Sequence, residues 1–325
     1  MPTVLITGGH KGIGLEASRT IAKAGGLDLL LLGRDLPEMQ RVAGELHGAF
    51  GTNVQTIEVD VSSLASVRAA AHSCRQFVGQ SRIAPLSALL LNAGAQFPDP
   101  PTYSVDGYEL TFATNCLGHF LLLNLLLGDL TSDARIVFTV SGTHDPETTD
   151  GKIVGKASRA DAFELANQGR AGTAIIGGRR YSTSKLCTVM YAYELDRRLR
   201  SVGADMLSVA YDPGMIPETG LTATIPKLAK ALLRTRAMKR VLKALGVTIG
   251  NLRFSGDMLG RLAMDPAYAN VSGKFMQSRN CQSIEQRSST ASYDRDVAHK
   301  LWNDSIEIVA LKPGELPELF AKLQP

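Results

Sequence analysis

The segment GGRRYSTSKLC, residues 177–187, contains a tyrosine and a lysine that could transfer a proton together. Tyr181 and Lys185 stand four residues apart, so on a helix they project from the same face. A phenol with a pKa of about 10 is a poor acid or base at neutral pH, but a nearby ammonium stabilises the phenolate and lowers that pKa. Because this spacing also arises by chance, the interpretation requires polar partners elsewhere in the chain.

Ser141 and Asn115 are the residue types that such a proton transfer needs. Ser141 closes the apolar run ARIVFTVS and could hold the oxygen of a substrate for protonation. Asn115, in TNCLGHF, can bind a helix carbonyl and a water molecule that passes protons to the solvent. The predicted catalytic residues are therefore Asn115, Ser141, Tyr181 and Lys185.

A glycine-rich turn, TGGHKGIG at residues 7–14, follows an apolar run and precedes a helical pattern. Gly8, Gly12 and Gly14 depart from the GxGxxG spacing but serve the same physical purpose. Glycines let the turn fold tightly and let the backbone approach a pyrophosphate, which then lies at the positive end of the helix. We predict a dinucleotide site here; a glycine-rich turn without a ligand is the alternative.

The second apolar run ends in a cation, where an NAD-binding enzyme would place an acid for the ribose hydroxyls. This run, LLLLGRD, ends at Gly33 and Arg34, and Lys11 lies in the glycine-rich turn. Two cations suit the 2′-phosphate of NADP(H), which is the predicted cofactor. Two alternatives remain: Asp35 could turn back toward the ribose, and Arg34 could be an ordinary surface charge.

Six apolar runs predict the strands that position these residues. They are TVLITG (3–8), LDLLLLGR (27–34), NVQTIEVD (53–60), LSALLLNAG (86–94), ARIVFTVSG (134–142) and ADMLSVAYDPG (204–214). Continuous apolar runs indicate strands buried on both faces of a parallel sheet, and helical segments separate them. The predicted fold is α/β, a doubly wound Rossmann-type parallel sheet in a single domain over residues 1–325. Its carboxyl edge, where such sheets bind ligands, would carry Asp60, Val61 and the NAG of residues 92–94.

Two additions interrupt this pattern. The segment 142–180 joins Ser141 to Tyr181 and is longer than ordinary connections, so we expect it to wall a substrate pocket, with a short helix at 159–167. The segment 217–262 is predicted to be a helical lid. Within it, residues 226–246 contain seven cations, no acid and an apolar stripe at helical spacing. We expect this stretch either to pack as a lid with its cations in water, or to contact an anionic membrane peripherally as a basic amphipathic helix.

Composition restricts the remaining classes. Of 325 residues, 44% are hydrophobic and 20% charged, which is typical of a globular protein with a full core. A net charge of +4 gives no reason to expect nucleic acid as a partner. Widely spaced cysteines and the absence of a secretory pattern in MPTVLITGG predict a cytoplasmic location, and the apolar stretch 117–130 predicts a buried helix. The histidines lack metal-ligand spacing, so no metal site is predicted.

Taken in order, these motifs resemble the short-chain dehydrogenase/reductase family over roughly residues 3–220: TGxxxGIG, NAG, Asn115, Ser141, YxxxK and Pro213–Gly214. The resemblance implies hydride transfer to or from a nicotinamide, with Tyr181 as acid/base. It assigns Lys185 to the nicotinamide ribose, Ser141 to the substrate carbonyl and Asn115 to a proton relay, and it favours a homo-oligomer. The predicted cofactor-binding residues are Gly8, Lys11, Gly12, Ile13, Gly14, Arg34, Asp60, Val61, Asn92, Ala93, Gly94, Tyr181, Lys185, Pro213, Gly214, Ile216 and Thr219.

Within this family, the segments TNCLGHFLLLNLLL, YSTSKLC, PGMIPETGL and HKLWNDSIEIVAL look like light-dependent protochlorophyllide reductases and, next to them, retinol dehydrogenases. Those reductases carry a cysteine directly after the Pro-Gly pair, where this chain has Met215, whose thioether cannot donate a proton. We therefore interpret the chain as an NADPH-dependent reductase of a carbonyl or conjugated double bond in a different, bulky hydrophobic substrate. The alternatives are the light-driven pigment reductase itself and a non-catalytic protein that senses NADP(H).

Overall fold

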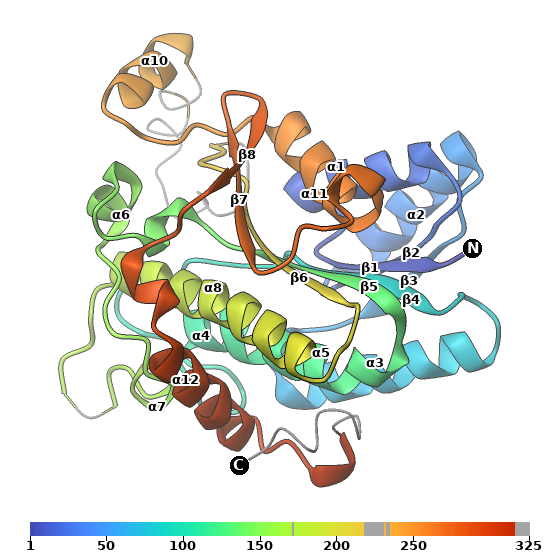
Figure 1. The fold of residues 1–325 in the computed structure, drawn as a ribbon, viewed down its shortest axis with the longest axis horizontal. Helices are drawn as coiled ribbons and strands as arrows, with labels where there is room; N and C mark the ends of the chain where they lie inside the picture. Colours follow the sequence, from blue (N-terminus) through green and yellow to red (C-terminus); the bar gives the residue numbers. More distant parts are fainter. Residues whose placement is uncertain (171, 218–230, 232–234, 316–325) are drawn as a thin grey trace.

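The computed structural model describes residues 1–170, 172–217, 231 and 235–315, and an eight-stranded sheet forms the centre of this part of the chain (Figure 1). The strand order is β3-β2-β1-β4-β5-β6-β7-β8, and every neighbouring pair is parallel except β7 with β8. The strands are β1 (Thr3–Thr7), β2 (Asp28–Gly33), β3 (Val54–Glu58), β4 (Leu86–Leu91), β5 (Leu130–Thr139), β6 (Leu207–Asp212), β7 (Lys274–Arg279) and β8 (Gln282–Gln286). The predicted α/β doubly wound sheet is confirmed. Because the order reverses between β1 and β4, their carboxyl ends open a crevice of the kind that binds nucleotides.

The continuous apolar strands are explained by a core on each face of the sheet. In β2, Leu30 and Leu32 pack into one core, and Leu29 and Leu31 pack into the other. All four leucines are fully buried. An apolar side chain is therefore needed at every position of the strand, not at every second one.

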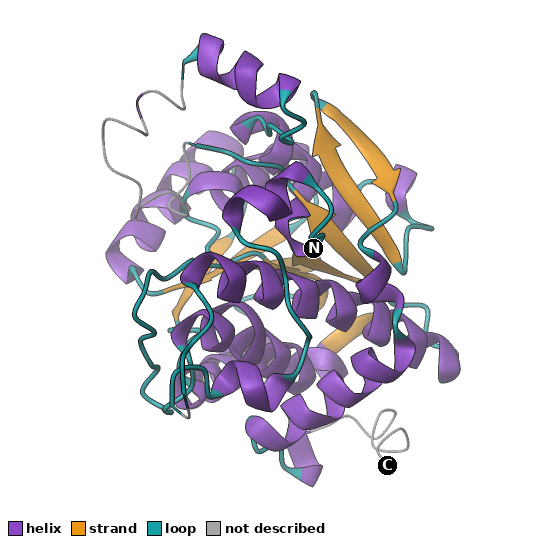
Figure 2. Cartoon of the chain, turned by 90° about the vertical axis from the view of Figure 1, so that its left-hand side faces the viewer, coloured by secondary structure: helices purple, strands orange, loops and turns teal. Residues whose placement is uncertain are grey.

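Helices cover both faces, as two views at right angles show (Figure 1, Figure 2). One core gathers α1 (Gly12–Ala24), α2 (Leu36–Phe50) and α11 (Leu252–Met264). The other core gathers α3 (Leu64–Gly79), α5 (Gly118–Leu126), α8 (Gly177–Ser201) and α12 (Arg295–Ile308). The stretch Leu110–Asp129 is long and apolar enough to cross a membrane, but 89% of its apolar window is buried inside the fold. This agrees with the predicted buried helix at 117–130.

The predicted lid segment 217–262 extends too far toward the C-terminus. Residues 252–262 belong to α11, which packs directly against α1 and does not border the second, catalytic-side cavity. A Cβ on Gly256 would come within 2.2 Å of the Glu16 Cβ and 2.8 Å of the Ile13 carbonyl, so only glycine permits this approach. An apolar stripe shows that a helix buries one face, but it does not show which surface it covers. Of the rest of the segment, the structure describes α10 (Arg236–Ala244), while 218–230 and 232–234 lie outside the described residues.

The segment 142–180 contains more regular structure than the sequence suggested. It holds a 3₁₀ turn (Gly142–His144), α6 (Thr149–Val154) and α7 (Ala162–Ala166). The helix α7 falls within the predicted 159–167, whereas α6 was not predicted. Thr148 begins α6 as an N-cap, with its hydroxyl accepting a hydrogen bond from the Gly151 N–H at 3.0 Å.

Candidate active site

The glycine-rich turn is folded tightly onto the end of β4. Gly8 adopts a φ of +70°, and a Cβ on Gly14 would lie 2.3 Å from the Gly8 carbonyl oxygen. The Thr7 hydroxyl accepts hydrogen bonds from the N–H groups of Asn92 and Ala93, both at 2.9 Å. The predicted turn and the NAG motif therefore lie together at the carboxyl edge, across the β1–β4 crevice.

A cavity of about 330 Å³ opens at this edge. Ten of the predicted cofactor residues line it: Gly8, Lys11, Gly12, Ile13, Arg34, Asp60, Val61, Asn92, Ala93 and Gly94. Gly14 lies beneath the turn and contributes its small size instead. The lining also includes residues that were not predicted to bind the cofactor, among them His10.

The cation pair at the end of β2 lies where the cofactor hypothesis requires it. The side chains of Lys11 and Arg34 are exposed and border the cavity, next to Gly33. Asp35 caps α2, because its Oδ1 accepts a hydrogen bond from the Glu38 N–H at 3.1 Å. The cap engages one oxygen of the carboxylate that the alternative would turn toward the ribose.

A second cavity of about 430 Å³ adjoins the first, sharing Ile13, Asn92 and Gly94 in its lining. Ser141, Tyr181 and Lys185 also border this second cavity, as do Gly142, Thr143, Asp150, Ile153 and Val154 from the segment 142–180. Pro213, Gly214, Met215 and Ile216 form another part of its wall, whereas Thr219 lies outside the described residues. The structure thus brings the predicted residues that it describes onto two adjoining cavities, apart from Asn115 and Gly14, which line neither.

The helix α8 presents Tyr181 and Lys185 to Ser141. Ser141 and Tyr181 line the same cavity, and hydrogen bonding by the Ser141 side chain acts to lower the pKa of Tyr181. The Lys185 Nζ donates to the Thr139 carbonyl at 2.9 Å and lies 5.8 Å from the centre of the Tyr181 ring. A nucleophilic or acidic hydroxyl, a cation and a positioning hydroxyl therefore meet at one wall.

Burial dominates the electrostatics of this pair, and the expected lowering of the Tyr181 pKa is not found. Burial raises the pKa of Tyr181 above its ordinary value, while the hydrogen bond with Ser141 acts in the opposite direction. Burial also lowers the pKa of Lys185 to about 8. The ammonium lies near the ring but is itself desolvated, so its stabilisation of a phenolate is smaller than the desolvation cost.

Asn115 lies in a π-helical turn, Ala113–Leu117, and its amide is engaged on both sides. Its Nδ2 donates to the Ala95 carbonyl and to the Ser184 hydroxyl, each at 2.9 Å. Its Oδ1 accepts from the Ala95 N–H at 2.9 Å. In the described structure Asn115 thus holds the residue that follows the NAG motif, and its role in a proton relay stays a prediction.

Asp212 is a buried carboxylate of the second cavity that sequence reasoning missed. It is 1% exposed and ends β6, where its oxygens accept from the Gly214 N–H at 2.9 Å and from the Gln277 Nε2 at 2.7 Å. Burial raises the pKa of this carboxyl to about 6. The sequence contains a signal for this residue, because YDPG places an acid at the carboxyl end of a predicted strand.

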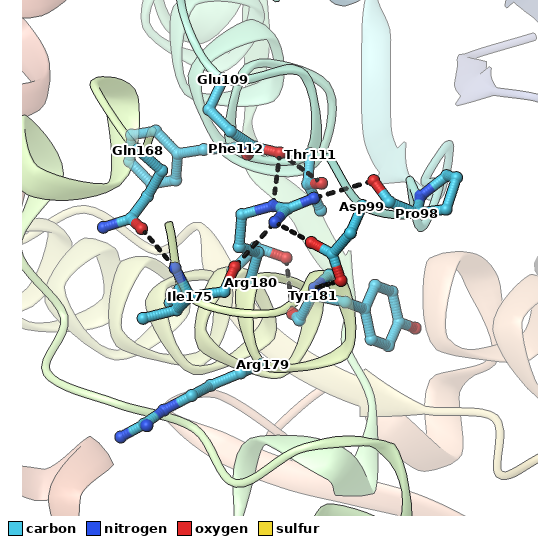
Figure 3. Close-up of polar contacts among 12 residues, drawn as sticks. Pro98, Asp99, Glu109, Thr111, Phe112, Gln168, Ile175, Arg179, Arg180 and Tyr181 are labelled. Atoms are coloured by element: carbon cyan, nitrogen blue, oxygen red, sulfur yellow. Dashed lines mark hydrogen bonds and ion pairs between the residues drawn. The ribbon is translucent and has the colours of Figure 1, made fainter. Parts of the chain in front are cut away.

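Arg180, next to the predicted acid/base, anchors the start of α8 (Figure 3). Its guanidinium is 1% exposed and forms an ion pair with the equally buried Glu109 at 3.0 Å. It also binds the Asp99 carboxylate at 2.7 Å and the carbonyls of Ile175 and Pro98 at 2.7 and 3.0 Å. These contacts join three separate chain segments directly beside Tyr181.

Comparison with known proteins identifies the class that this fold and site define. The chain belongs to the short-chain dehydrogenase family, whose model matches residues 2–153, and it is therefore an oxidoreductase. A chloroplastic protochlorophyllide reductase of Daucus carota is 30% identical over 325 residues, covering 95% of this chain and 78% of that protein. The resemblance predicted from the motifs is confirmed.

Solved structures support the same fold. A crystal structure of an uncharacterised protein from Mycobacterium paratuberculosis superposes with a TM-score of 0.68 at 25% identity, covering 95% of this chain and 94% of that one. A blue fluorescent protein from a metagenomic library, solved in complex with NADPH, gives a TM-score of 0.61 at 23% identity, with coverages of 86% and 96%. At 23% identity, the likeness to this second structure is evidence for the fold alone.

Proposed function

We propose that the protein is an NADPH-dependent reductase that transfers hydride to a carbonyl of a bulky hydrophobic substrate, with Tyr181 as general acid/base. The observation that carries the proposal is the Ser141–Tyr181–Lys185 constellation on the wall where a larger cavity adjoins a glycine-lined one. A conjugated double bond of such a substrate is the other group that could accept the hydride. A cytoplasmic location and a homo-oligomer remain part of this proposal.

The residues of the first cavity fit a dinucleotide with a 2′-phosphate. A backbone that only glycine allows at Gly8 and Gly14 leaves room for a pyrophosphate beside the N-terminus of α1. Lys11 and Arg34 supply positive charge at the other end, and Asp35 is engaged in capping α2. When bound, NADPH supplies the hydride.

The catalytic side chains would then transfer one proton to the substrate oxygen. Ser141 holds the substrate oxygen by a hydrogen bond, and the Tyr181 hydroxyl donates its proton to that oxygen and becomes a phenolate. Burial disfavours this anion, and the Lys185 ammonium, 5.8 Å from the centre of the ring, offsets part of that cost. Removal of the Tyr181 hydroxyl alone should therefore stop turnover while leaving the cofactor bound.

The test is Tyr181→Phe, measured by NADPH consumption with hydrophobic aldehydes and ketones and by NADPH binding. We expect turnover to fall by roughly 10²-fold or more with unchanged NADPH affinity. Tyr193→Phe is the matched control, since Tyr193 lies on the same helix but its hydroxyl bonds Ser288, 2.7 Å away. Turnover of Tyr181→Phe at the level of that control would remove Tyr181 from the mechanism.

A light-driven double-bond reductase is the second candidate, favoured by the similarity to the carrot protochlorophyllide reductase. Against it stands Met215, which lines the second cavity and carries no transferable proton. Turnover in darkness on a carbonyl substrate supports the first candidate. A strict requirement for visible light supports the second.

Peripheral contact with an anionic membrane is the proposed route for a hydrophobic substrate. In α10, Leu242 lines the second cavity, while Val241 and Leu245 are 52% and 60% exposed beside the exposed Arg240 and Lys243. A helix that combines exposed apolar side chains with cations suits the surface of anionic lipid. This arrangement would place the mouth of the cavity near the membrane.

A further inference from the structure

His10 is a buried side chain in the glycine-rich turn that lacks the partners its chemistry requires. It is 3% exposed, and neither ring nitrogen has a hydrogen-bond partner among the described residues. A buried polar group without a hydrogen-bond partner costs about 1–3 kcal/mol of stability. The unpaired imidazole therefore indicates a further interaction that offsets this cost.

The other two buried histidines show what a purely structural imidazole looks like in this fold. His119 Nε2 lies 3.0 Å from the Thr7 hydroxyl, and His144 Nδ1 lies 2.7 Å from the Ser141 carbonyl. Both are as buried as His10, at 3% and 2% exposure. His10 differs from them in lining a cavity instead of a network of protein hydrogen bonds.

The position of the ring is fixed between the turn and the end of β2. The His10 Cε1 lies 2.8 Å, and its Nδ1 3.2 Å, from the point that a Cβ on Gly33 would occupy. The Met39 sulfur lies 3.2 Å from the same point. In a dinucleotide fold, the adenosine ribose meets the protein at the end of the second strand. The ring therefore borders the part of the cavity that also carries Lys11 and Arg34.

The charges around His10 make its protonation sensitive to an anion. Burial and then the adjacent Lys11 lower its pKa below the ordinary value, while Asp35 and Glu38 act in the opposite direction. Both acids interact with other groups: Asp35 caps α2, and Glu38 forms an ion pair with Arg41 at 2.6 Å. A neutral ring has one N–H donor, and an added phosphate dianion would favour the imidazolium, which has two.

We infer that His10 is a third residue that binds the 2′-phosphate of the cofactor, together with Lys11 and Arg34, and that it takes up a proton when the phosphate binds. The inference rests on the proposed NADPH dependence and adds a pH-linked selectivity to it. A cofactor with a free 2′-hydroxyl carries no negative charge at this point, so its binding should not favour protonation of the His10 ring.

The test uses 2′,5′-ADP and 5′-AMP, which differ only in the 2′-phosphate, as ligands of the full-length protein in isothermal titration calorimetry. His10→Gln keeps a hydrogen-bond donor but cannot take up a proton. We expect this variant to bind 2′,5′-ADP about tenfold or more weakly than the wild type and 5′-AMP within about twofold. Titration in two buffers of different ionisation enthalpy should show proton uptake with 2′,5′-ADP that the variant lacks.

A second measurement does not depend on the variant's folding. In the wild type, the ring protons of His10, followed by NMR, should titrate at a higher pH once 2′,5′-ADP is added. Equal weakening of both ligands in His10→Gln, or an unchanged titration of the wild-type ring, would overturn the role of His10 alone. A wild type that binds both ligands equally would overturn the NADPH preference, and the His10 inference with it.

Discussion

Replacing Glu109 with alanine should be among the most destabilising single changes in this protein. The Glu109 carboxylate and the Arg180 guanidinium are each 1% exposed and are joined at 3.0 Å (Figure 3). Removing one partner of a buried ion pair leaves the other charge uncompensated, which costs about 3–5 kcal/mol. Glu109 also accepts hydrogen bonds from the Phe112 N–H and the Thr111 hydroxyl, both at 2.8 Å, so two more donors lose their acceptor. We therefore expect a loss of about 3–5 kcal/mol in the free energy of unfolding.

Asp99→Ala is the matched control, because Asp99 pairs with the same guanidinium from a solvent-exposed position. Its side chain is 54% exposed, and the Arg180–Asp99 distance is 2.7 Å, shorter than the buried pair. Solvent screens an exposed carboxylate, so the loss should be about 1 kcal/mol despite the shorter contact. Comparing the two variants shows whether burial or distance determines the loss in the free energy of unfolding.

Urea unfolding followed by circular dichroism measures both variants, with the slope of each transition checked against the wild type. A cost for Glu109→Ala below about 1 kcal/mol, or equal to that of Asp99→Ala, would refute the reasoning. The folded fraction of Glu109→Ala should also lose turnover, since Arg180 immediately precedes Tyr181 and fixes the start of α8.

Three further outcomes follow from the site. Arg34→Ala should weaken NADPH binding by about 1.5–3 kcal/mol and leave NADH nearly unaffected in fluorescence titrations; equal losses would make Arg34 structural. Ile153→Ala, in the wall of the second cavity, should change KM across a series of hydrophobic carbonyls but not NADPH affinity, and the reverse pattern would contradict that assignment. The protein should co-sediment with anionic vesicles at low salt and be released at high salt, and neutralising Arg240 and Lys243 with glutamine should weaken this binding by about 1 kcal/mol per cation; no pelleting at low salt would leave α10 as a lid.

The strands that could be predicted are those whose burial is visible in the sequence. Apolar runs predicted β1 to β6, most of which are buried on both faces, although the edge strand β3 is only partly buried. The last two strands, β7 and β8, were missed, since KFMQSR and QSIEQ carry mostly polar side chains. The edge strand β8 buries less surface, whereas the buried strand β7 places polar Gln277 and Ser278 inside, where they bind Asp212 and Tyr211.

The parts of the site that could not be predicted depend on which surfaces meet in three dimensions. Two adjacent arginines at a helix start, Arg179 and Arg180, look alike in sequence, yet one is exposed and the other is 1% exposed. Glu109 lies 71 positions away from its partner, and no local pattern connects them. The prediction of a lowered pKa for Tyr181 was wrong for the same reason. Spacing on a helix reveals a neighbouring charge but not how deeply the tyrosine is buried.

Asp212 provides a test of that burial through the pH dependence of stability. Its folded pKa is raised from 3.8 to about 6, so the folded state binds a proton more tightly than the unfolded state does. Its contribution to the free energy of unfolding must therefore fall as pH rises from about 4 to 6, by an amount on the order of 3 kcal/mol. Asp212→Asn removes the charge, and the Gln277 amide can rotate to offer its oxygen to the new Nδ2.

We expect Asp212→Asn to match the wild type near pH 4 and to be more stable above about pH 6, in urea unfolding at each pH. The exposed Asp133, replaced in the same way, should show no such difference. A variant that is equally destabilised at all pH values would mean that the carboxylate is held by its hydrogen bonds with Gly214 and Gln277 more strongly than burial opposes it. An anion that costs stability in the wall of the second cavity is typical of a functional residue and not of a stabilising one.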